Sequence, residues 1–587
     1  MIPQTQTTQS QTTATRLSYA LIGAIAGLCA WALIEIVADV IDNARIVLLL
    51  VSSGLGFFGV LLGLLGPVRL VPAAAAALGM AVPAAALLLW ASFRYSDVEG
   101  FLGRGYALAA FIYLLSISVP FVVAGLQRHG GWRHYGLLFD AAWELVVRTA
   151  AAWLFVGVVW TVLFLSDALL GLVGLNIIQD LIDIEPVPYL VSGLALGLGL
   201  AIVHELRDYV SPFLVIQLLR VLLPALLIVL AVFVAALPFR GLGNLFGQLS
   251  AAATLMAVTV AGITLVTTAI HRDDPLSVQG PVMRISAQVL SVMLPVPAVL
   301  ALWAVWLRVD QYGLTPDRVA ALVAAGVVSI YAVAYAGAVL RRRAWRAEQR
   351  RVNRRMALLT LVIAAAWLTP LLNAERLSTS SQLARATEGV LPEKLALWEM
   401  AHDWGKAGQR GLSRLEARAQ DDTDLLTLIN KARRTEVRWD YQSPTGDAAI
   451  SPLAGIVPLR PEGRSLPPGA LDALDGYDRV SIHEACNRRA PGGHPGCVMV
   501  IAPFEPQDGA EQVLGFFITA GSGVRIASYA LQDGVLISEG SARDLASGNY
   551  PSAEPQIVTD ILEGRFRIVP APRSVLDVGG MQLFPQK

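Results

Sequence analysis

Two histidines and two cysteines near the carboxyl end of the chain have a spacing that could do chemistry. They form the pattern H-x2-C-x7-H-x2-C, with His483, Cys486, His494 and Cys497. Imidazole and thiolate groups are zinc ligands, so these four side chains could form a metal site. The two cysteines alone could instead form a disulfide, because the intervening PGGHPG sequence turns easily. We predict the disulfide, since the remaining cysteine, Cys29, lies in an apolar run, and the metal site is the alternative.

Ionisable side chains inside long apolar runs form the second group of candidates, because a charge in hydrocarbon is costly and is typical of functional sites. Glu144 and Arg148 are one helical turn apart. Arg220 lies deep in another run, one turn from Gln217. We take these four residues as a candidate polar site in the membrane. Simple pairing of Glu144 with Arg148 is the structural alternative.

Sequences that mark common enzymes are missing from the chain. It has no GxSxG, HExxH or P-loop sequence, and no GxGxxG before a helix. We therefore predict no catalytic residues and no cofactor, and the sequence favours a non-enzymatic protein.

The elements that position these residues are membrane helices. Of the 587 residues, 55% are hydrophobic and only 15% are charged, which is typical of a membrane protein. A helix needs roughly 20 apolar residues to cross the hydrocarbon. On that rule we predict about eleven spans, at residues 17–40, 45–65, 68–93, 101–125, 137–165, 189–206, 211–237, 246–270, 283–307, 317–340 and 356–372. They form a helical membrane domain over 17–372, preceded by a polar tail over 1–16 that we expect to be disordered.

The orientation follows from an arginine-dense loop between the last two predicted spans. Such a loop stays in the cytoplasm by the positive-inside rule. An odd number of spans then places the amino terminus in the cytoplasm and everything after residue 372 outside it. Arg94 and Arg104 weaken this pattern, because they fall in an outside loop, whereas the outside loop over 166–188 is acidic and suits a short interfacial helix. The loop arginines are Arg341, Arg342, Arg343, Arg346, Arg350, Arg351, Arg354 and Arg355.

The chain after residue 372 changes character. Residues 373–437 have helical spacing, with breaks expected at Gly405, Gly408 and Gly411. Residues 438–587 contain short apolar runs bounded by turn residues, which we predict to be antiparallel strands. The runs are CVMVIAPF, QVLGFFITA, VRIASYAL and GVLISEG. The predicted fold class is therefore a polytopic α-helical membrane protein with a C-terminal extracytoplasmic α+β domain.

One stretch resembles a known family. The YGLTPDR sequence at residues 312–318, the arginine-dense loop, and the residues after the last span are similar to bacterial membrane proteins grouped as domain of unknown function 4153. The resemblance implies a bacterial cytoplasmic-membrane protein and brings no established activity. It also singles out a candidate docking face, on which the turn and the segment after the last span pack together and hold the outer domain. Its residues are Tyr312, Arg318, Asn373, Ser381, Gln382 and Arg385.

Three classes of function fit this architecture. The first is an envelope scaffold or sensor whose outer domain binds a partner or ligand, with the lipid bilayer and an envelope protein as its partners. The second is a secondary transporter or channel for a small anionic solute, favoured by Arg220 and by prolines inside spans. The third is a membrane-embedded enzyme that acts on lipid-linked material. Nucleic acid is not an expected partner, because residues 373–587 hold 22 basic and 27 acidic residues.

Overall fold

The computed structural model divides the chain into two compact units, residues 1–426 and 427–587, and each is described by itself. The residues that the structure describes are 4–126, 131–205, 212–240, 249–341, 344–419, 422–438, 441, 453, 455–471, 474, 476–504, 511–519, 523–532, 534–544, 551, 553–569, 575–578 and 581–584.

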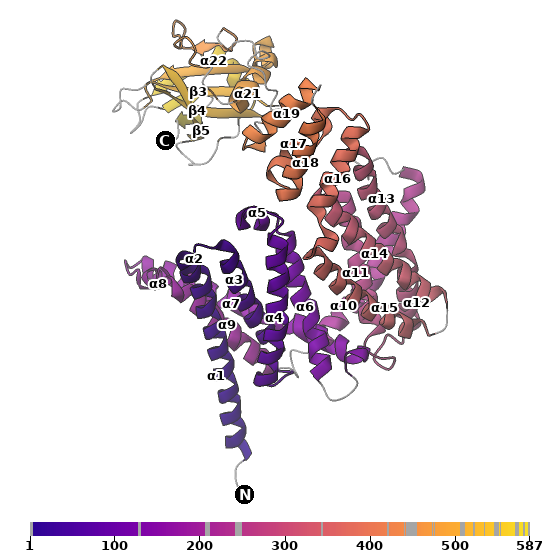
Figure 1. The fold of residues 1–587 in the computed structure, drawn as a ribbon. Helices are drawn as coiled ribbons and strands as arrows, with labels where there is room; N and C mark the ends of the chain where they lie inside the picture. The colour runs from indigo at the N-terminus through magenta and orange to yellow at the C-terminus, as the bar shows by residue number, and fades with distance from the viewer. Residues whose placement is uncertain are drawn as a thin grey trace. The chain divides into compact units, whose positions relative to one another are not determined.

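The first unit begins with a half-bundle of long helices around one apolar core (Figure 1). Alanine and leucine side chains such as Ala77, Ala85 and Leu88 are fully buried in it, because small residues let membrane helices approach closely. Its helices are α1 (Gln4–Trp31, continued by a π-turn at Ala32–Ile36 and α2 at Val37–Val40), α3 (Ala44–Leu64), α4 (Leu70–Ser92), α5 (Val98–Leu102), α6 (Tyr106–Leu126), α7 (Tyr135–Gly171), α8 (Ile177–Ile182) and α9 (Pro186–Glu205).

A second half-bundle follows, with its own core around Leu223, Val266, Leu290 and Tyr335. Leu294 joins α12 to α13, and Pro295 occupies the first position of α13, where a missing N–H costs nothing. The helices of this half-bundle are α10 (Pro212–Arg240), α11 (Leu249–Ile270), α12 (Pro281–Met293), α13 (Pro295–Tyr312), α14 (Pro316–Leu340) and α15 (Trp345–Trp367).

These helices agree with the predicted spans. Among the described residues, ten helical segments are long and apolar enough to cross a membrane, with α12 and α13 counted as one. The count rises to eleven if α15 forms a span with the helical segment that follows it after an 84° bend. The chain is therefore a multi-pass membrane protein. A short helix, α8, lies in the acidic stretch where one was expected.

Helix α15 corrects one boundary. We expected the last span to begin at residue 356 after an arginine-dense loop, but α15 begins at Trp345. Arg346, Arg350 and Arg354 therefore lie on its first three turns, and Arg342 and Arg343 fall outside the described residues. A charged helix can start inside the protein because its arginines bind backbone carbonyls there, so hydropathy alone places its start too late.

Helices α1 and α9 pack against each other through glycines at matched spacing. A Cβ atom added to Gly193 would lie 2.2 Å from the carbonyl oxygen of Gly23, and one added to Gly27 would lie 2.1 Å from that of Tyr189. Gly197 meets the backbone of α1 in the same way. Both helices thus carry a small-xxx-small motif, GAIAG and GLALG, which permits direct contact between backbones.

Three shorter helices continue the first unit beyond α15. They are α16 (Ala374–Thr387), α17 (Leu397–His402) and α18 (Gly405–Arg418), and α19 (Thr423–Arg434) contains the division between the units. Helix α18 begins at Gly405, which has φ of 49°, so the break expected there is present. We also expected breaks at Gly408 and Gly411, but these two glycines do not separate helices. They lie within α18, where a Cβ atom at Gly408 would meet the carbonyl oxygen of Met400 at 2.2 Å. The glycines therefore serve close packing.

The second unit is built around a sheet with the strand order β1-β2-β3-β4-β5. The four predicted runs are its antiparallel strands β2 (Cys497–Ala502), β3 (Gln512–Ile518), β4 (Val524–Gln532) and β5 (Val535–Ser541). Strand β1 (Leu459–Arg460) pairs in parallel with β2 and was not predicted. Helix α21 (Gly476–Asn487) covers one face and α22 (Gln556–Leu562) the other, so β2 and β3 are buried on both faces. A smaller sheet holds β6 (Arg543–Asp544), β7 (Arg567–Val569), β8 (Val575–Val578) and β9 (Met581–Phe584).

Candidate functional site

The two predicted membrane arginines bind the carbonyl ends of neighbouring helices. Arg148 on α7 is only 3% exposed and donates to the carbonyl oxygens of Gly63 and Leu65, where α3 ends. Arg220 on α10 donates from Nε to the Thr268 carbonyl oxygen at 2.9 Å, near the end of α11. The last carbonyl groups of a helix lack intrahelical partners and carry the negative end of the helix dipole. A guanidinium group supplies both the hydrogen-bond donors and the positive charge that these carbonyl groups lack.

All three nitrogens of the Arg220 side chain have protein partners. Besides the bond to Thr268, Nη1 donates to Oε1 of Gln217 at 3.0 Å and Nη2 donates to the Leu276 carbonyl oxygen at 2.9 Å. The predicted proximity of Arg220 and Gln217 thus exists in the structure. Arg220 therefore acts as a structural clamp between neighbouring segments. Because its nitrogens are already hydrogen-bonded, little of the guanidinium group is left to bind an anionic solute.

Replacing Arg220 with glutamine should therefore lower stability. The change removes charge-assisted bonds to two carbonyl groups, and we expect a loss of about 1.5–3 kcal/mol. The midpoint of unfolding in an SDS titration of detergent-solubilised protein measures it. Arg69→Gln, at an exposed position before α4, is the matched control and should change the midpoint little. Equal midpoints for the two variants would contradict the clamp.

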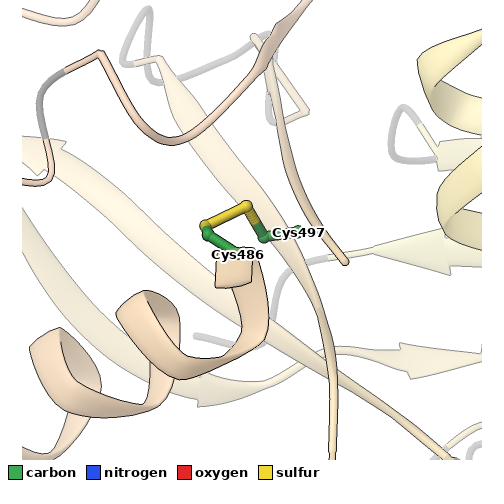
Figure 2. Close-up of a disulfide and its surroundings, with 2 residues drawn as sticks. All are labelled: Cys486 and Cys497. Carbon is green, nitrogen blue, oxygen red and sulfur yellow. A yellow bond between two sulfur atoms is a disulfide. The ribbon is translucent and has the colours of Figure 1, made fainter. Parts of the chain in front are cut away.

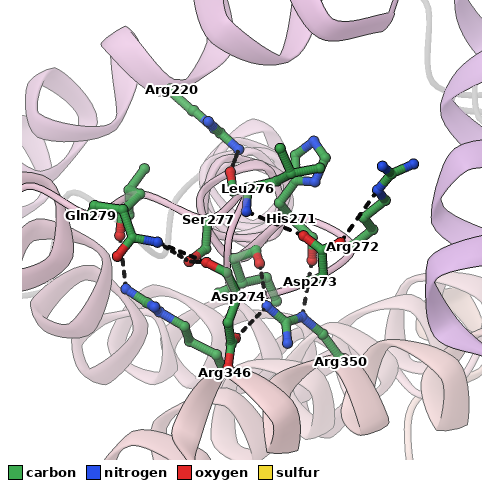
Figure 3. A network of polar contacts seen from close by, with 12 residues as sticks. Arg220, His271, Arg272, Asp273, Asp274, Leu276, Ser277, Gln279, Arg346 and Arg350 are labelled. Atoms are coloured by element: carbon green, nitrogen blue, oxygen red, sulfur yellow. Dashed lines mark hydrogen bonds and ion pairs between the residues drawn. The ribbon is translucent and has the colours of Figure 1, made fainter.

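The loop that Arg220 holds, residues 271–279, is fixed from several sides (Figure 3). Arg350 on α15 donates to the carbonyl oxygens of Ile270 and His271 and to Oδ1 of Asp274, at 2.7–3.1 Å. Arg346 donates to the Val278 carbonyl oxygen at 2.8 Å. The arginines that we had predicted in a cytoplasmic loop therefore tie α15 to the end of α11 and the start of α12.

A cavity of about 410 Å³ lies beside this loop, at the junction of the two half-bundles. The first half-bundle contributes residues of α7 and α9, and the second contributes the start of α10 and the loop. Glu144 and Arg148 line it, whereas Arg220 and Gln217 do not, so the four predicted polar residues form two separate groups. The lining residues are Phe139, Asp140, Trp143, Glu144, Val147, Arg148, Val203, His204, Pro212, Phe213, Ile216, His271, Arg272 and Leu276.

The charged groups of the cavity differ in how they are paired. Asp140 accepts from Nη1 of Arg272 at 2.7 Å, and both side chains are about half exposed. Glu144 makes no hydrogen bond or ion pair with the described residues. Burial, and then the charges of Arg220 and Arg272, lowers the pKa of His271 to about 4, so its ring is neutral at pH 7.

Residues of the predicted docking face make contacts between α16 and the turn after α13. The Ser381 hydroxyl accepts from the Leu314 amide at 3.0 Å, and Gln382 donates to the carbonyl oxygens of Tyr312 and Leu314 at 3.2 and 3.3 Å. Arg385 donates to the carbonyl oxygens of Asp310 and Gln311 at 3.4 and 3.2 Å, at the end of α13.

The remaining residues of that face shape its two sides. The Asn373 side chain caps α16 by accepting from the Arg376 amide at 2.8 Å. Arg318 donates to the Gly313 carbonyl oxygen at 2.8 Å and lies over the Tyr312 ring. Gly313 has φ of 76°, and a Cβ atom there would meet Cδ of Arg385 at 2.5 Å, so the turn needs glycine. Together these contacts fix α16 to the membrane helices.

Arg94 and Arg104, the two exceptions to the charge pattern, strengthen the same assembly. Arg94 donates to the carbonyl oxygens of Trp367 and Thr369 at 2.7 and 2.6 Å and lies 3.6 Å from Glu375. Arg104 pairs with Asp403 and lies 3.8 Å from Asp317. Partners from distant segments neutralise the charges of these two arginines. A count of arginines per loop ignores such partners and therefore overestimates the positive charge of this loop.

Asn353 is a buried polar residue that sequence reasoning missed, because it falls within the predicted arginine-rich loop. Its side-chain oxygen accepts from the hydroxyls of Tyr331 and Tyr335, and its Nδ2 donates to the Tyr135 hydroxyl at 2.8 Å. Thr267 lies 2.8 Å from the Tyr335 hydroxyl. The network links α7 of the first half-bundle to α11, α14 and α15 of the second.

The second unit contains the predicted disulfide. Cys486, at the end of α21, is bonded to Cys497, at the start of β2 (Figure 2). Both sulfurs are therefore occupied, and the four-residue metal site would need the bond to be reduced. His494 lies 3.5 Å from Glu563. Among the described residues, no cluster of three or more histidine, cysteine, aspartate or glutamate side chains could hold a metal ion.

Comparison with known proteins gives one match. The chain matches the family model of the domain of unknown function DUF4153 over residues 57–395. Neither a curated protein nor a solved structure matches it. The matched region contains the cavity, the arginine clamps, Asn353 and the docking face, whereas the whole second unit, with the disulfide, lies beyond it. Since the match covers more than half of the 587 residues, the chain belongs to the DUF4153 family.

Proposed function

We propose that this protein is an envelope scaffold or sensor of the bacterial cytoplasmic membrane. In this proposal the amino terminus is cytoplasmic, and the second unit lies outside the cytoplasm and binds a partner or ligand. The membrane helices anchor that unit and pass conformational changes to it.

The course of α15 supports this orientation. Its first turns bind the ends of α11 and α12 through Arg350 and Arg346, and its last carbonyl groups accept from Arg94, which follows α4. Helix α4 begins shortly after Leu65, whose carbonyl group binds Arg148, and it ends shortly before Arg94. Its two ends therefore lie at opposite ends of the bundle. Helix α15 also runs from one of these ends of the bundle to the other, so we count it as a further crossing of the membrane. The total number of crossings is then odd. The disulfide agrees, because such bonds persist in oxidising compartments.

The contacts that helices α16, α17 and α18 make with the membrane helices support the proposal that conformational changes pass to the second unit. Arg94 and Arg104 come from the first half-bundle, and Gln382 and Arg385 bind the turn after α13 in the second. Lys406 at the start of α18 also donates to the Phe93 carbonyl oxygen at 3.2 Å. The helices that lead to the second unit therefore contact both half-bundles, so a shift between the half-bundles would move them.

Thiol labelling of cells tests the orientation. A cysteine at Glu393, exposed between α16 and α17, should react with a membrane-impermeant maleimide in intact spheroplasts. A cysteine at Arg355, whose side chain is 69% exposed on the first turns of α15, should react only after permeabilisation. Native Cys29 is replaced by serine in both variants. Labelling of both positions under the same condition would overturn the proposed orientation.

Partner binding is tested separately by photo-crosslinking in living cells. A crosslinkable residue at Ile537, exposed on β5 at an edge of the sheet, should give an adduct of discrete mass with an envelope component. The same residue at Arg355 is the matched control and should not give that adduct. Absence of any specific adduct from Ile537 and from other exposed positions of the second unit would count against the scaffold or sensor.

The cavity favours transport as a second candidate function. Ligand sites commonly lie where two parts of a fold meet, as this cavity does. The arginine that suggested an anionic solute, Arg220, has its nitrogens occupied, so Glu144 is the residue to test. If the protein is a transporter, cells that express Glu144→Gln should lose uptake of a solute that wild type accumulates.

A further inference from the structure

The cavity between the half-bundles contains polar groups for which the described part of the protein supplies no partner. Glu144 has neither a hydrogen bond nor an ion pair there, although it lines the cavity. Both terminal nitrogens of Arg148 bind carbonyl groups of the α3 end, but its Nε has no hydrogen-bond partner. His271, 6% exposed, likewise has no partner for Nδ1. Nε of Arg148 and Nδ1 of His271 are fully buried, so a ligand in the cavity does not reach them directly, whereas the partly exposed carboxylate of Glu144 is accessible to a bound molecule.

The rest of the wall is apolar and partly aromatic. Phe139, Trp143 and Phe213 line the cavity together with Val147 and Ile216. A volume of about 410 Å³ falls in the range of small-molecule sites, which are roughly 300–1,000 Å³ and combine an apolar wall with a few polar groups. The wall can therefore hold a small ligand or one end of a larger one.

The charges of the wall limit the ligand further. Asp140 and Arg272 neutralise each other at 2.7 Å, and the other two full charges among the described lining residues are Glu144 and Arg148. These four charges sum to zero, and the imidazole of His271 is neutral at pH 7. A simple anion or cation would thus add a net charge to a site whose own charges balance, whereas a molecule with one charge of each sign would not.

We propose that this cavity binds a zwitterion that carries a primary ammonium group and an anionic oxygen. The ammonium group donates to the carboxylate of Glu144, and the anionic oxygen lies on the side of Arg148, whose positive charge attracts it. The two residues are four positions apart, about 6 Å along α7, so the two ends of a small zwitterion can lie beside them. Free phosphoethanolamine has this chemistry, and so does the headgroup of phosphatidylethanolamine. The cavity lies among the membrane helices, so its ligand does not depend on the proposed orientation or partner.

Binding to purified full-length protein tests the proposal and separates the two sources. Delipidated protein in detergent is titrated with phosphoethanolamine, with ethylamine and inorganic phosphate as singly charged comparisons, and binding is followed by calorimetry. Lipid binding is followed by native mass spectrometry with phosphatidylethanolamine or phosphatidylglycerol micelles. We expect the zwitterion to bind more tightly than either singly charged compound, and phosphatidylethanolamine to be retained over phosphatidylglycerol. Binding of the free zwitterion shows that the headgroup chemistry suffices, and retention of the lipid alone identifies a lipid site.

Two variants connect the binding to the cavity. Glu144→Gln keeps the shape of the side chain and should weaken binding about 10- to 100-fold, because it removes a charge-assisted bond. Val147→Phe should abolish binding by filling the cavity while all charges remain. Glu35→Gln is the matched control, since Glu35 is another membrane-helix glutamate, bonded to Tyr189 and remote from the lining residues. Unchanged binding in Glu144→Gln, or equal binding of ethylamine, phosphate and phosphoethanolamine, would overturn the proposal.

Discussion

Replacing Gly193 with leucine will force α1 and α9 apart and strongly destabilise the first unit. A Cβ atom at this position lies 2.2 Å from the carbonyl oxygen of Gly23 and 3.0 Å from the backbone of Gly27. Both obstacles are backbone atoms, so no rotamer change relieves the overlap, and the helices must separate. Overpacking typically costs about 1–3 kcal/mol and sometimes more. We expect a value at or above the top of that range, since separation also removes the other glycine contacts.

The midpoint of SDS-induced unfolding, compared with wild type in the same detergent, measures this effect. Gly79→Leu is the matched control, because Gly79 is also in a membrane helix and a Cβ atom there has nothing within 4 Å. The alanine variant of Gly193 should fall between wild type and leucine. If Gly193→Leu and Gly79→Leu unfold at the same SDS fraction, direct contact between the two helix backbones is not important for stability.

The small-xxx-small motifs that form this contact can be recognised in the sequence. The sequence does not show which helix each motif packs against. GAIAG and GLALG are visible as small-xxx-small patterns, but many membrane helices carry small residues. Only the fold shows that the first helix of the half-bundle packs against the last. The spans themselves were predictable, because roughly 20 apolar residues are needed wherever a helix crosses hydrocarbon. The strands β2 to β5 were predictable for a similar reason, since short apolar runs between turn residues determine them locally.

The functions of the arginines could not be predicted in the same way. Arg220, Arg94 and Arg350 each bind carbonyl groups of a helix that is distant in sequence. A guanidinium group in an apolar run looks the same in the sequence whether it binds an anion or the end of a neighbouring helix. The choice depends on which helix end lies beside it. The sequence therefore located Arg220 and Gln217 correctly as neighbours, but it could not show that their nitrogens and oxygen are already engaged.

Asn353 illustrates the same limit and gives the second large effect that we expect. Replacing it with leucine, which has a similar size, should lower stability by about 2–4 kcal/mol, because the hydroxyls of Tyr135 and Tyr331 then lose their bonds to its amide. Tyr331 keeps a side-chain hydrogen bond with Tyr335. Tyr335 keeps its contact with Thr267 and is less affected. Membrane hydrogen bonds measured one at a time are often worth only about 0.6 kcal/mol, so the expected size depends on several bonds failing together. SDS titration of the purified variant measures the loss.

Removing the tyrosine hydroxyls as well distinguishes this explanation from simple loss of packing. The variant that combines Asn353→Leu with Tyr135→Phe and Tyr331→Phe keeps only one hydroxyl that had bonded the amide, that of Tyr335, which retains its contact with Thr267. It should be more stable than Asn353→Leu alone, because replacing both members of a buried polar pair by apolar groups is close to neutral, whereas removing one member is costly. A triple variant that is less stable than Asn353→Leu would mean that the tyrosine hydroxyls find other partners. In that case the network would not hold the two half-bundles together.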